Sequence, residues 1–213
     1  MLLEIAKWSE LLSAFAVLLP LISLLYLVIK SGKKHLQFDI VLLSYYSIIS
    51  LYFQSLLMLT SLLGNNNLWL CHIFIPIELF FFSAILLYYS NEKIFYISVF
   101  LSAACFFIVS KFDEPGKLPF LSVLLQFFSI LLISPGALYR AISNYDARNI
   151  DRYYYSYQEY AIKGILLTVI GNFVFIAFVE KHLVLILFIH SILNIYSNYL
   201  FARTYKCYSE TNL

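Results

Sequence analysis

Long apolar runs separated by short polar stretches dominate the sequence, and they predict its fold. A bilayer core requires about 20 apolar residues in helical conformation. Seven runs reach or approach that length: Leu11–Ile29, Ile40–Leu63, Leu68–Tyr89, Ile94–Ser110, Leu118–Leu138, Ile162–Val179 and Leu183–Phe201. The fourth run is the shortest and lies at the lower edge of the range. The pattern therefore predicts an all-α polytopic membrane protein, with residues 1–213 forming a single domain, a bundle of seven transmembrane helices.

The composition agrees with this class and excludes several others. The chain is 62% hydrophobic and only 12% charged, about half the charged fraction of a soluble domain. A net charge of +2, spread over short loops, gives no reason to expect a nucleic-acid partner. Cys71, Cys105 and Cys207 lie far apart, so they indicate neither a disulfide framework nor a cysteine metal site. The first apolar run lacks a cleavage site and is expected to remain as a membrane span.

The distribution of Lys and Arg between the loops predicts the orientation of the bundle. Cytoplasmic loops of membrane proteins carry an excess of these residues. Ten lie on the side of the first loop: Lys30, Lys33, Lys34, Lys93, Arg140, Arg148, Arg152, Lys163, Arg203 and Lys206. Four lie on the other side: Lys7, Lys111, Lys117 and Lys181. We therefore expect the N-terminus outside and the C-terminus in the cytoplasm.

Polar residues inside the apolar runs mark a candidate site. His190, Asn194 and Asn198 are spaced i, i+4, i+8, so they form one stripe on the last helix, and such a stripe faces protein or water. Most other intramembrane polar residues also fall between the outer surface and the midplane. This layout predicts an outward-facing polar pocket that binds a small molecule or a proton. Its candidate residues are Glu78, His190, His72, Asn172, Asn194, Asn198 and Gln54.

Glu78 is the most informative of these residues. A carboxylate at the centre of a membrane helix costs about 2.5–3.5 kcal/mol on insertion scales. Because no Lys or Arg lies at a similar depth, Glu78 must be protonated, paired with a histidine, or hydrated. A proton-coupled role, with His190 as the second ionisable group, is one interpretation. The alternative is a protonated acid that bonds His190 or an asparagine and only holds helices together.

Other chemistries find less support in the pattern. His72, Glu78 and His190 would leave a zinc ion one open position, as catalytic sites do, but no HExxH-like pair lies on one helix face. On a straight helix, His72 and Glu78 also point about 120° apart. An intramembrane metalloenzyme is therefore the third hypothesis, and we expect no bound metal or cofactor. The last run contains no Lys, which excludes a retinal Schiff base there.

Three short segments resemble a group of seven-helix integral membrane proteins of Bacteroidetes. They are His72 followed six residues later by Glu78, Gly171-Asn172, and His190 followed four residues later by Asn194. The resemblance implies a bacterial inner-membrane protein, and it implies no mechanism because no activity is assigned to the group. Leu187-Phe188-Ile189 stands where that group usually has a Trp before the histidine.

A weaker similarity is architectural. Seven helices with the N-terminus outside can form three-plus-one-plus-three parallel repeats, as in SWEET sugar transporters. The leading hypothesis is nevertheless a receptor-like or accessory protein, and a SWEET-like or proton-coupled transporter is the second. With a short tail after Arg203, a receptor would need a membrane or cytoplasmic signalling partner, and the loop Arg140–Glu159 is the expected contact.

Overall fold

The computed structural model describes residues 8, 11–32, 35–63, 68–91, 94, 96–114, 117–146, 157–179 and 182–212. All the secondary-structure elements of more than one residue in these ranges are α-helices, which confirms the all-helical prediction. The helices are α2 (Leu18–Ser31), α3 (Phe38–Leu62), α4 (Leu68–Ser90), α5 (Ile97–Phe112), α6 (Phe120–Asp146), α7 (Tyr157–Phe178) and α8 (Leu183–Asn212).

Six of the predicted spans coincide with helices that are long and apolar enough to cross a membrane. The first of these covers Leu11–Ser31, and the other five are α3, α4, α6, α7 and α8. The fourth predicted run corresponds to α5, which has 16 residues and is shorter than a typical span. Helices α6 and α8 continue to Asp146 and Asn212, beyond the predicted runs, because a helix can extend past the point where its apolar sequence ends.

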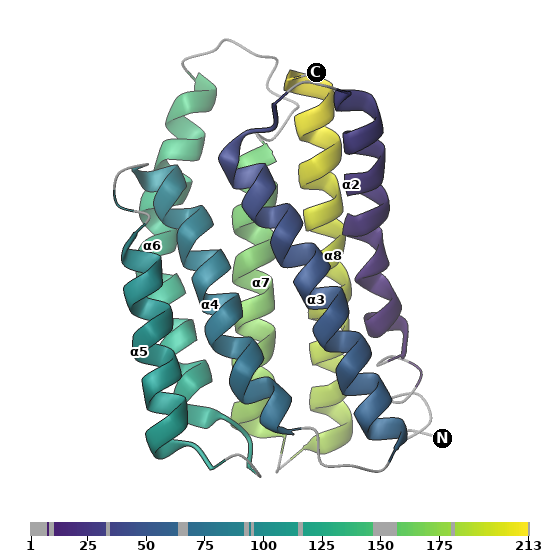
Figure 1. Ribbon diagram of the computed structural model, residues 1–213, viewed down its shortest axis with the longest axis vertical. Helices are drawn as coiled ribbons and strands as arrows, with labels where there is room; N and C mark the ends of the chain where they lie inside the picture. The colour runs from purple at the N-terminus through teal and green to yellow at the C-terminus, as the bar shows by residue number, and fades with distance from the viewer. Residues whose placement is uncertain are drawn as a thin grey trace.

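The helices form a ring with one helix outside it (Figure 1). Around the ring, α2 packs on α3, α3 on α4, α4 on α6, α6 on α7, α7 on α8, and α8 on α2. Helix α5 packs against the outer side of α4 and α6. The ring thus contains two consecutive sets of three helices, α2–α4 and α6–α8, which α5 connects. Because α5 adds one crossing, α2 and α6 run in the same direction (Figure 1).

Prolines lie inside three helices, and in α6 a nearby hydroxyl satisfies the carbonyl that the proline frees. The first span has a turn at Val17, directly after Ala16, whose carbonyl the Pro20 ring would otherwise meet. In α6, Pro135 cannot donate to the Leu131 carbonyl, which instead accepts a 3.2 Å hydrogen bond from Ser134 Oγ. Such substitution allows a proline inside a membrane helix.

The two halves of the bundle are packed differently along its long axis. We call the end where α2 ends and α3 begins the C-end, because the C-terminus also lies there (Figure 1). Near the C-end the interior is solid with fully buried large side chains, among them Phe82, Phe201 and Tyr205. A Cβ atom placed on Gly164 would lie 2.6 Å from the Phe201 ring, so α7 and α8 meet as closely as a glycine allows. The half toward the opposite end contains a cavity.

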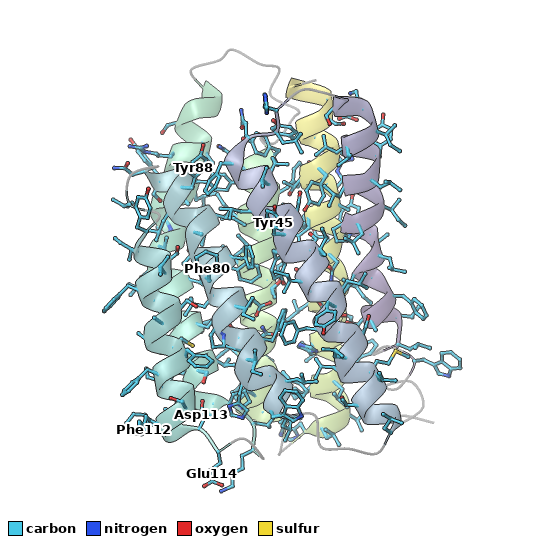
Figure 2. All side chains as sticks on the ribbon, viewed as in Figure 1. Tyr45, Phe80, Tyr88, Phe112, Asp113 and Glu114 are labelled. Atoms are coloured by element: carbon cyan, nitrogen blue, oxygen red, sulfur yellow. The ribbon has the colours of Figure 1, made fainter. Side chains whose placement is uncertain are left out.

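Large apolar side chains cover the outside of the bundle (Figure 2). Tyr45 is 58% exposed, and Phe112 is 67% exposed at the end of α5. Charged residues such as Asp113 and Glu114 follow at the helix end, beyond the apolar surface (Figure 2). This arrangement is the one a bilayer requires, with apolar groups toward lipid and charges at the ends. The chain is therefore a multi-pass membrane protein by the length and composition of its helices.

Candidate functional site

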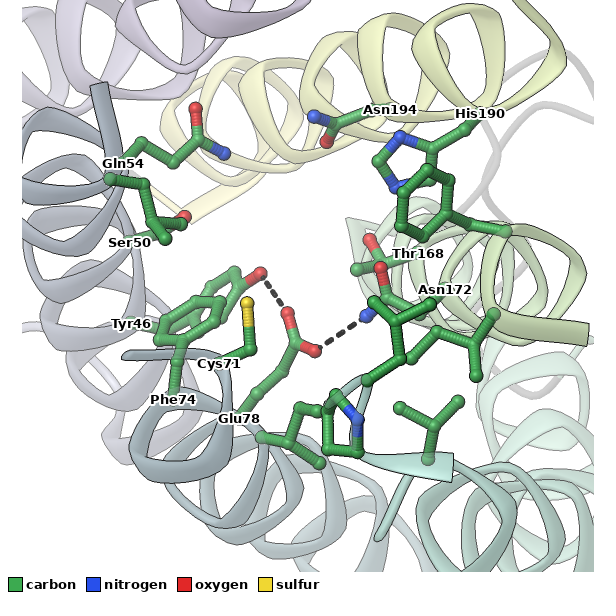
Figure 3. Close-up of a pocket in the computed structure, with 17 residues that line it drawn as sticks. Tyr46, Ser50, Gln54, Cys71, Phe74, Glu78, Thr168, Asn172, His190 and Asn194 are labelled. Atoms are coloured by element: carbon green, nitrogen blue, oxygen red, sulfur yellow. Dashed lines mark hydrogen bonds between the residues drawn. The ribbon is translucent and has the colours of Figure 1, made fainter. Parts of the chain in front are cut away.

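A cavity of about 190 Å³ lies inside the ring, between α3, α4, α7 and α8 (Figure 3). A water molecule occupies about 30 Å³ in the liquid, so the space suits a few waters or a small organic molecule. Leu57, Leu118 and Pro119 line its end away from the C-end. The polar side chains along its wall are Tyr46, Ser50, Gln54, Cys71, Glu78, Thr168, Asn172, His190 and Asn194.

Glu78 lies at the centre of this arrangement, in the middle of α4, and is 2% exposed. Its two carboxylate oxygens accept hydrogen bonds from three different helices. The Tyr46 hydroxyl of α3 donates to Oε1 at 2.9 Å. The side-chain amides of Gln126 in α6 and Asn172 in α7 both donate to Oε2, each at 2.8 Å. Figure 3 shows the bonds from Tyr46 and Asn172, on opposite sides of the carboxylate.

These three bonds lower the cost of an ionised carboxylate in the membrane. A hydrogen bond to a charged group contributes about 1.5–3 kcal/mol. The cost of a carboxylate at the helix centre is about 2.5–3.5 kcal/mol on insertion scales, so three such bonds can offset it. No Lys or Arg is among the residues that line the cavity in the described part of the chain. An ionised Glu78 thus gives the cavity a negative charge that no described cation neutralises.

Tyr46 also allows Glu78 to take up a proton without losing a partner. A phenol hydroxyl can donate or accept, whereas an amide NH₂ can only donate. If Oε1 is protonated, it can donate to Tyr46, which can then turn its own hydrogen toward the neighbouring Ser50. Oε2 keeps both amide donors in either state. The arrangement is therefore chemically suited to bind either a cation or a proton.

The predicted stripe on the last helix faces inward, and its three members have different surroundings. His190 lines the cavity opposite Glu78 and packs on Phe175, with ring centroids 5.0 Å apart (Figure 3). Asn194 lines the cavity and donates to Ser13 Oγ at 2.7 Å, which connects α8 to the first span. Asn198 donates to the backbone carbonyl and the side-chain oxygen of Asn194, at 2.9 and 3.1 Å. Asn198 is outside the cavity wall.

Of the other candidates, Gln54 and Asn172 line the cavity, and His72 does not. His72 Nε2 lies 3.0 Å from the Lys117 carbonyl, at the end of the bundle away from the C-end. The helix geometry explains this separation, because six residues of α4 turn His72 away from the direction of Glu78. No group of three or more His, Cys, Asp or Glu side chains in the described residues could hold a metal ion. The structure therefore does not bring together the three ligands of the metalloenzyme hypothesis.

Sequence reasoning did not select Tyr46, Ser50, Thr168 and Cys71, and it left Gln126 out of the candidate site. One signal was present for part of the set: Tyr46, Ser50 and Gln54 repeat at intervals of four, which places them on one face of a helix. Gln126 bonds Glu78 from α6 without lining the cavity, and no sequence pattern connects those two residues.

Comparisons of the chain with protein families, with curated proteins and with solved structures gave no match. The resemblance to the Bacteroidetes group therefore stays a prediction.

Proposed function

We propose that this protein binds a small cationic molecule or a proton in the cavity around Glu78, in a receptor-like or accessory role. The observation that supports this is a carboxylate with three neutral donors, facing a cavity that no described Lys or Arg lines. A protonated amine would complete the charge balance, and the neighbouring aromatic rings of Phe74 and Phe175 suit an organic cation.

The membrane setting belongs to the same proposal. Six apolar helices and the excess of Lys and Arg on one side support a multi-pass membrane protein with its C-terminus in the cytoplasm, and the resemblance to the Bacteroidetes group is the reason to propose a bacterial inner membrane. The cavity would then open from the outer half. A receptor of this kind needs a signalling partner, and the loop Arg140–Glu159 is our candidate contact. Residues 147–156 of that loop lie outside the described part of the chain.

Transport is the second candidate, and one feature of the fold favours it. The cavity lies between two three-helix sets that run in the same direction, and α3 and α4 of one set face α7 and α8 of the other. Transporters built from parallel repeats hold their substrates at such an interface. Ser50 and Gln54 of α3 stand across from Thr168 and Asn172 of α7, so both sets contribute similar polar groups (Figure 3).

A thermal-stability series tests the binding proposal. Purified protein and Glu78→Gln would be melted across pH, with sodium, potassium and a series of small primary amines, each amine paired with the alcohol of the same carbon chain. A ligand at about 100 times its dissociation constant adds about 2.7 kcal/mol to the stability of the native state. We expect at least one cation or low pH to stabilise the wild type and not Glu78→Gln. Identical melting of both proteins under every condition overturns the proposal.

A matched control and a second assay sharpen the result. Glu210 is an exposed carboxylate on α8, paired with Lys206, and Glu210→Gln should keep the full response. Uptake of the stabilising compound into proteoliposomes then separates the two candidates. Accumulation inside the vesicles shows transport, whereas stabilisation without flux supports a receptor-like role.

A further inference from the structure

A second buried carboxylate lies at the C-end, far from the cavity. Asp39 is the second residue of α3, and its side chain is 0% exposed. Neither carboxylate oxygen makes a hydrogen bond of regular geometry in the part of the chain that the structure describes, although the Tyr89 and Tyr157 hydroxyls and the first backbone N–H groups of α3 lie beside it. A buried carboxylate without partners is costly unless something neutralises it. A bound proton removes this cost, and the hydroxyls beside Asp39 can exchange one with it.

The groups that face Asp39 are hydroxyls. Tyr89 of α4 and Tyr157 of α7 are the described titratable side chains beside it. Tyr157 donates to the side-chain oxygen of Gln37 at 2.5 Å, and the Gln37 backbone N–H donates to the Tyr208 hydroxyl at 3.1 Å. Helices α3, α4, α7 and α8 thus all contribute to a polar cluster, which we call the Asp39 cluster: Gln37, Asp39, Tyr89, Tyr157 and Tyr208.

Nearby basic side chains are occupied elsewhere or exposed, as far as the described residues show. Lys30 donates to the Ser209 carbonyl at 2.5 Å, and Lys163 pairs with Glu159 at 3.4 Å. Arg203 lies over the Tyr160 ring, 5.5 Å from its centre. Lys206 pairs with Glu210 on the surface. Within the described chain, Asp39 therefore has no salt bridge.

One face of α3 connects Asp39 with the cavity. Asp39, Tyr46, Ser50 and Gln54 are separated by seven, four and four residues, which places all of them within about 80° of arc on a helix. Tyr46 is bonded to Glu78. The rise from Asp39 to Tyr46 is about 10 Å, a distance that a few hydroxyls or waters can bridge.

Further hydroxyls lie in the interval between Asp39 and Tyr46. Ser47 Oγ and the Tyr205 hydroxyl are 3.0 Å apart, both buried, and Ser44 lies beside the same tyrosine. Leu43, which is 0% exposed, fills the α3 face at this level. The hydroxyls therefore do not form one unbroken chain in this conformation, and passage along them requires a movement of the C-end half or the entry of water.

We propose that Asp39 is a second proton-binding site and that protons pass between Glu78 and Asp39 along the hydroxyl-bearing face of α3. A proton enters from the cavity onto Glu78 Oε1, moves through the Tyr46 and Tyr205 hydroxyls as each accepts one proton and releases another, and leaves from Asp39 at the C-end. No electrons move and no other bond is made or broken. This inference goes beyond the binding function, because it needs no ligand except the proton.

The test is proton flux into proteoliposomes that contain a pH-sensitive dye and are driven by a potassium diffusion potential. We expect wild-type vesicles to acidify faster than protein-free vesicles. Asp39→Asn and Glu78→Gln should each lower this protein-dependent rate by roughly tenfold or more, because an uncharged amide cannot bind and release the proton. Tyr205→Phe should also lower the rate, since it removes a hydroxyl and keeps the ring.

Controls separate this proposal from misfolding and from the binding proposal. Glu210→Gln removes an exposed carboxylate at the same end and should keep the wild-type rate. Asp39→Asn should elute as a monodisperse protein and keep the cation or pH response of the melting assay, because Asp39 is outside the cavity. Wild-type vesicles without protein-dependent flux, or an Asp39→Asn rate equal to wild type, overturn the proton path. The response that depends on Glu78 can persist in either case, so the two proposals fail separately.

Discussion

Two buried carboxylates in one bundle have opposite surroundings. Glu78 faces a cavity and accepts three well-aligned hydrogen bonds, whereas Asp39 is enclosed in the solid C-end half and has none of regular geometry in the described chain. Burial is nearly equal, at 2% and 0% exposure. The degree of burial of a carboxylate therefore does not by itself determine whether it is stable in its charged form. Three well-aligned donors around Glu78 stabilise its charged form, whereas the hydroxyls beside Asp39 are poorly aligned with it and leave its charge to be neutralised by a proton.

The largest expected effect comes from removing the acceptor at Glu78. Glu78→Ala leaves the Tyr46 hydroxyl and the amides of Gln126 and Asn172 without a partner, and each unsatisfied buried donor costs about 1–3 kcal/mol. We expect the free energy of unfolding in mixed micelles to fall by about 3 kcal/mol or more. Glu78→Gln keeps one oxygen acceptor, so its loss should be clearly smaller. Equal losses in the two variants would contradict the assigned bonds.

A pair of glycines tests the difference in packing between the two halves. Gly164 faces Phe201 in the solid half, where an added Cβ would lie 2.6 Å from the ring. Overpacking of this kind costs about 1–3 kcal/mol, so Gly164→Ala should lower the free energy of unfolding by that amount. Gly171 lies beside the cavity, and its added Cβ would come no closer than 3.4 Å to Leu193.

Gly171→Ala is the matched control. Ala is favoured over Gly in a helix interior by about 1 kcal/mol, so this variant should be neutral or more stable. The same denaturation assay measures both variants. If both glycines respond alike, the difference between a solid half and a hollow half is wrong.

Much of the fold could be predicted from the sequence, because hydropathy gives the length of each apolar segment and that length predicts whether the segment spans a membrane. It predicted seven spans, six of which coincide with helices long and apolar enough to cross a membrane, and it directed attention to Glu78, whose charge is conspicuous inside an apolar run. It placed the start of the second span at Ile40, one residue after Asp39, and so assigned Asp39 to a loop. The structure begins α3 at Phe38, because a helix can start before its apolar stretch, and α4 and α7 enclose the aspartate.

The partners within the site were harder to predict for a physical reason. Hydrogen bonds to Glu78 come from α3, α6 and α7, between 32 and 94 residues away in sequence. Which helices meet is decided by side-chain shape, such as the approach of α7 and α8 at Gly164, and hydropathy contains no information on that. His72 illustrates the converse: its separation of six residues from Glu78 correctly indicated a different direction on the helix.

Tyr46→Phe should have an intermediate effect and sharpen the account of Glu78. The substitution removes one donor from Oε1 and leaves the ring contact with Phe82, whose centroid is 4.7 Å away. Loss of one bond to a charged group costs about 1.5–3 kcal/mol, at the lower end if water from the cavity replaces it. A double-mutant cycle with Glu78→Gln measures the coupling. Additive losses would show that the two side chains do not act together.

The smallest expected effect has the opposite sign, and it tests the interpretation of Asp39. An acidic residue in the first turn of a helix gains about 0.3–1 kcal/mol from the helix dipole. A buried polar group without hydrogen bonds costs about 1–3 kcal/mol by mutational data, so the cost exceeds the gain. Asp39→Leu should therefore raise the free energy of unfolding by about 1 kcal/mol while it abolishes proton flux. A buried acid that only stabilised the helix start would give the reverse pattern, lower stability with flux unchanged. A gain in stability together with lost flux is the pattern expected when a protein retains an unfavourable group because its function requires it.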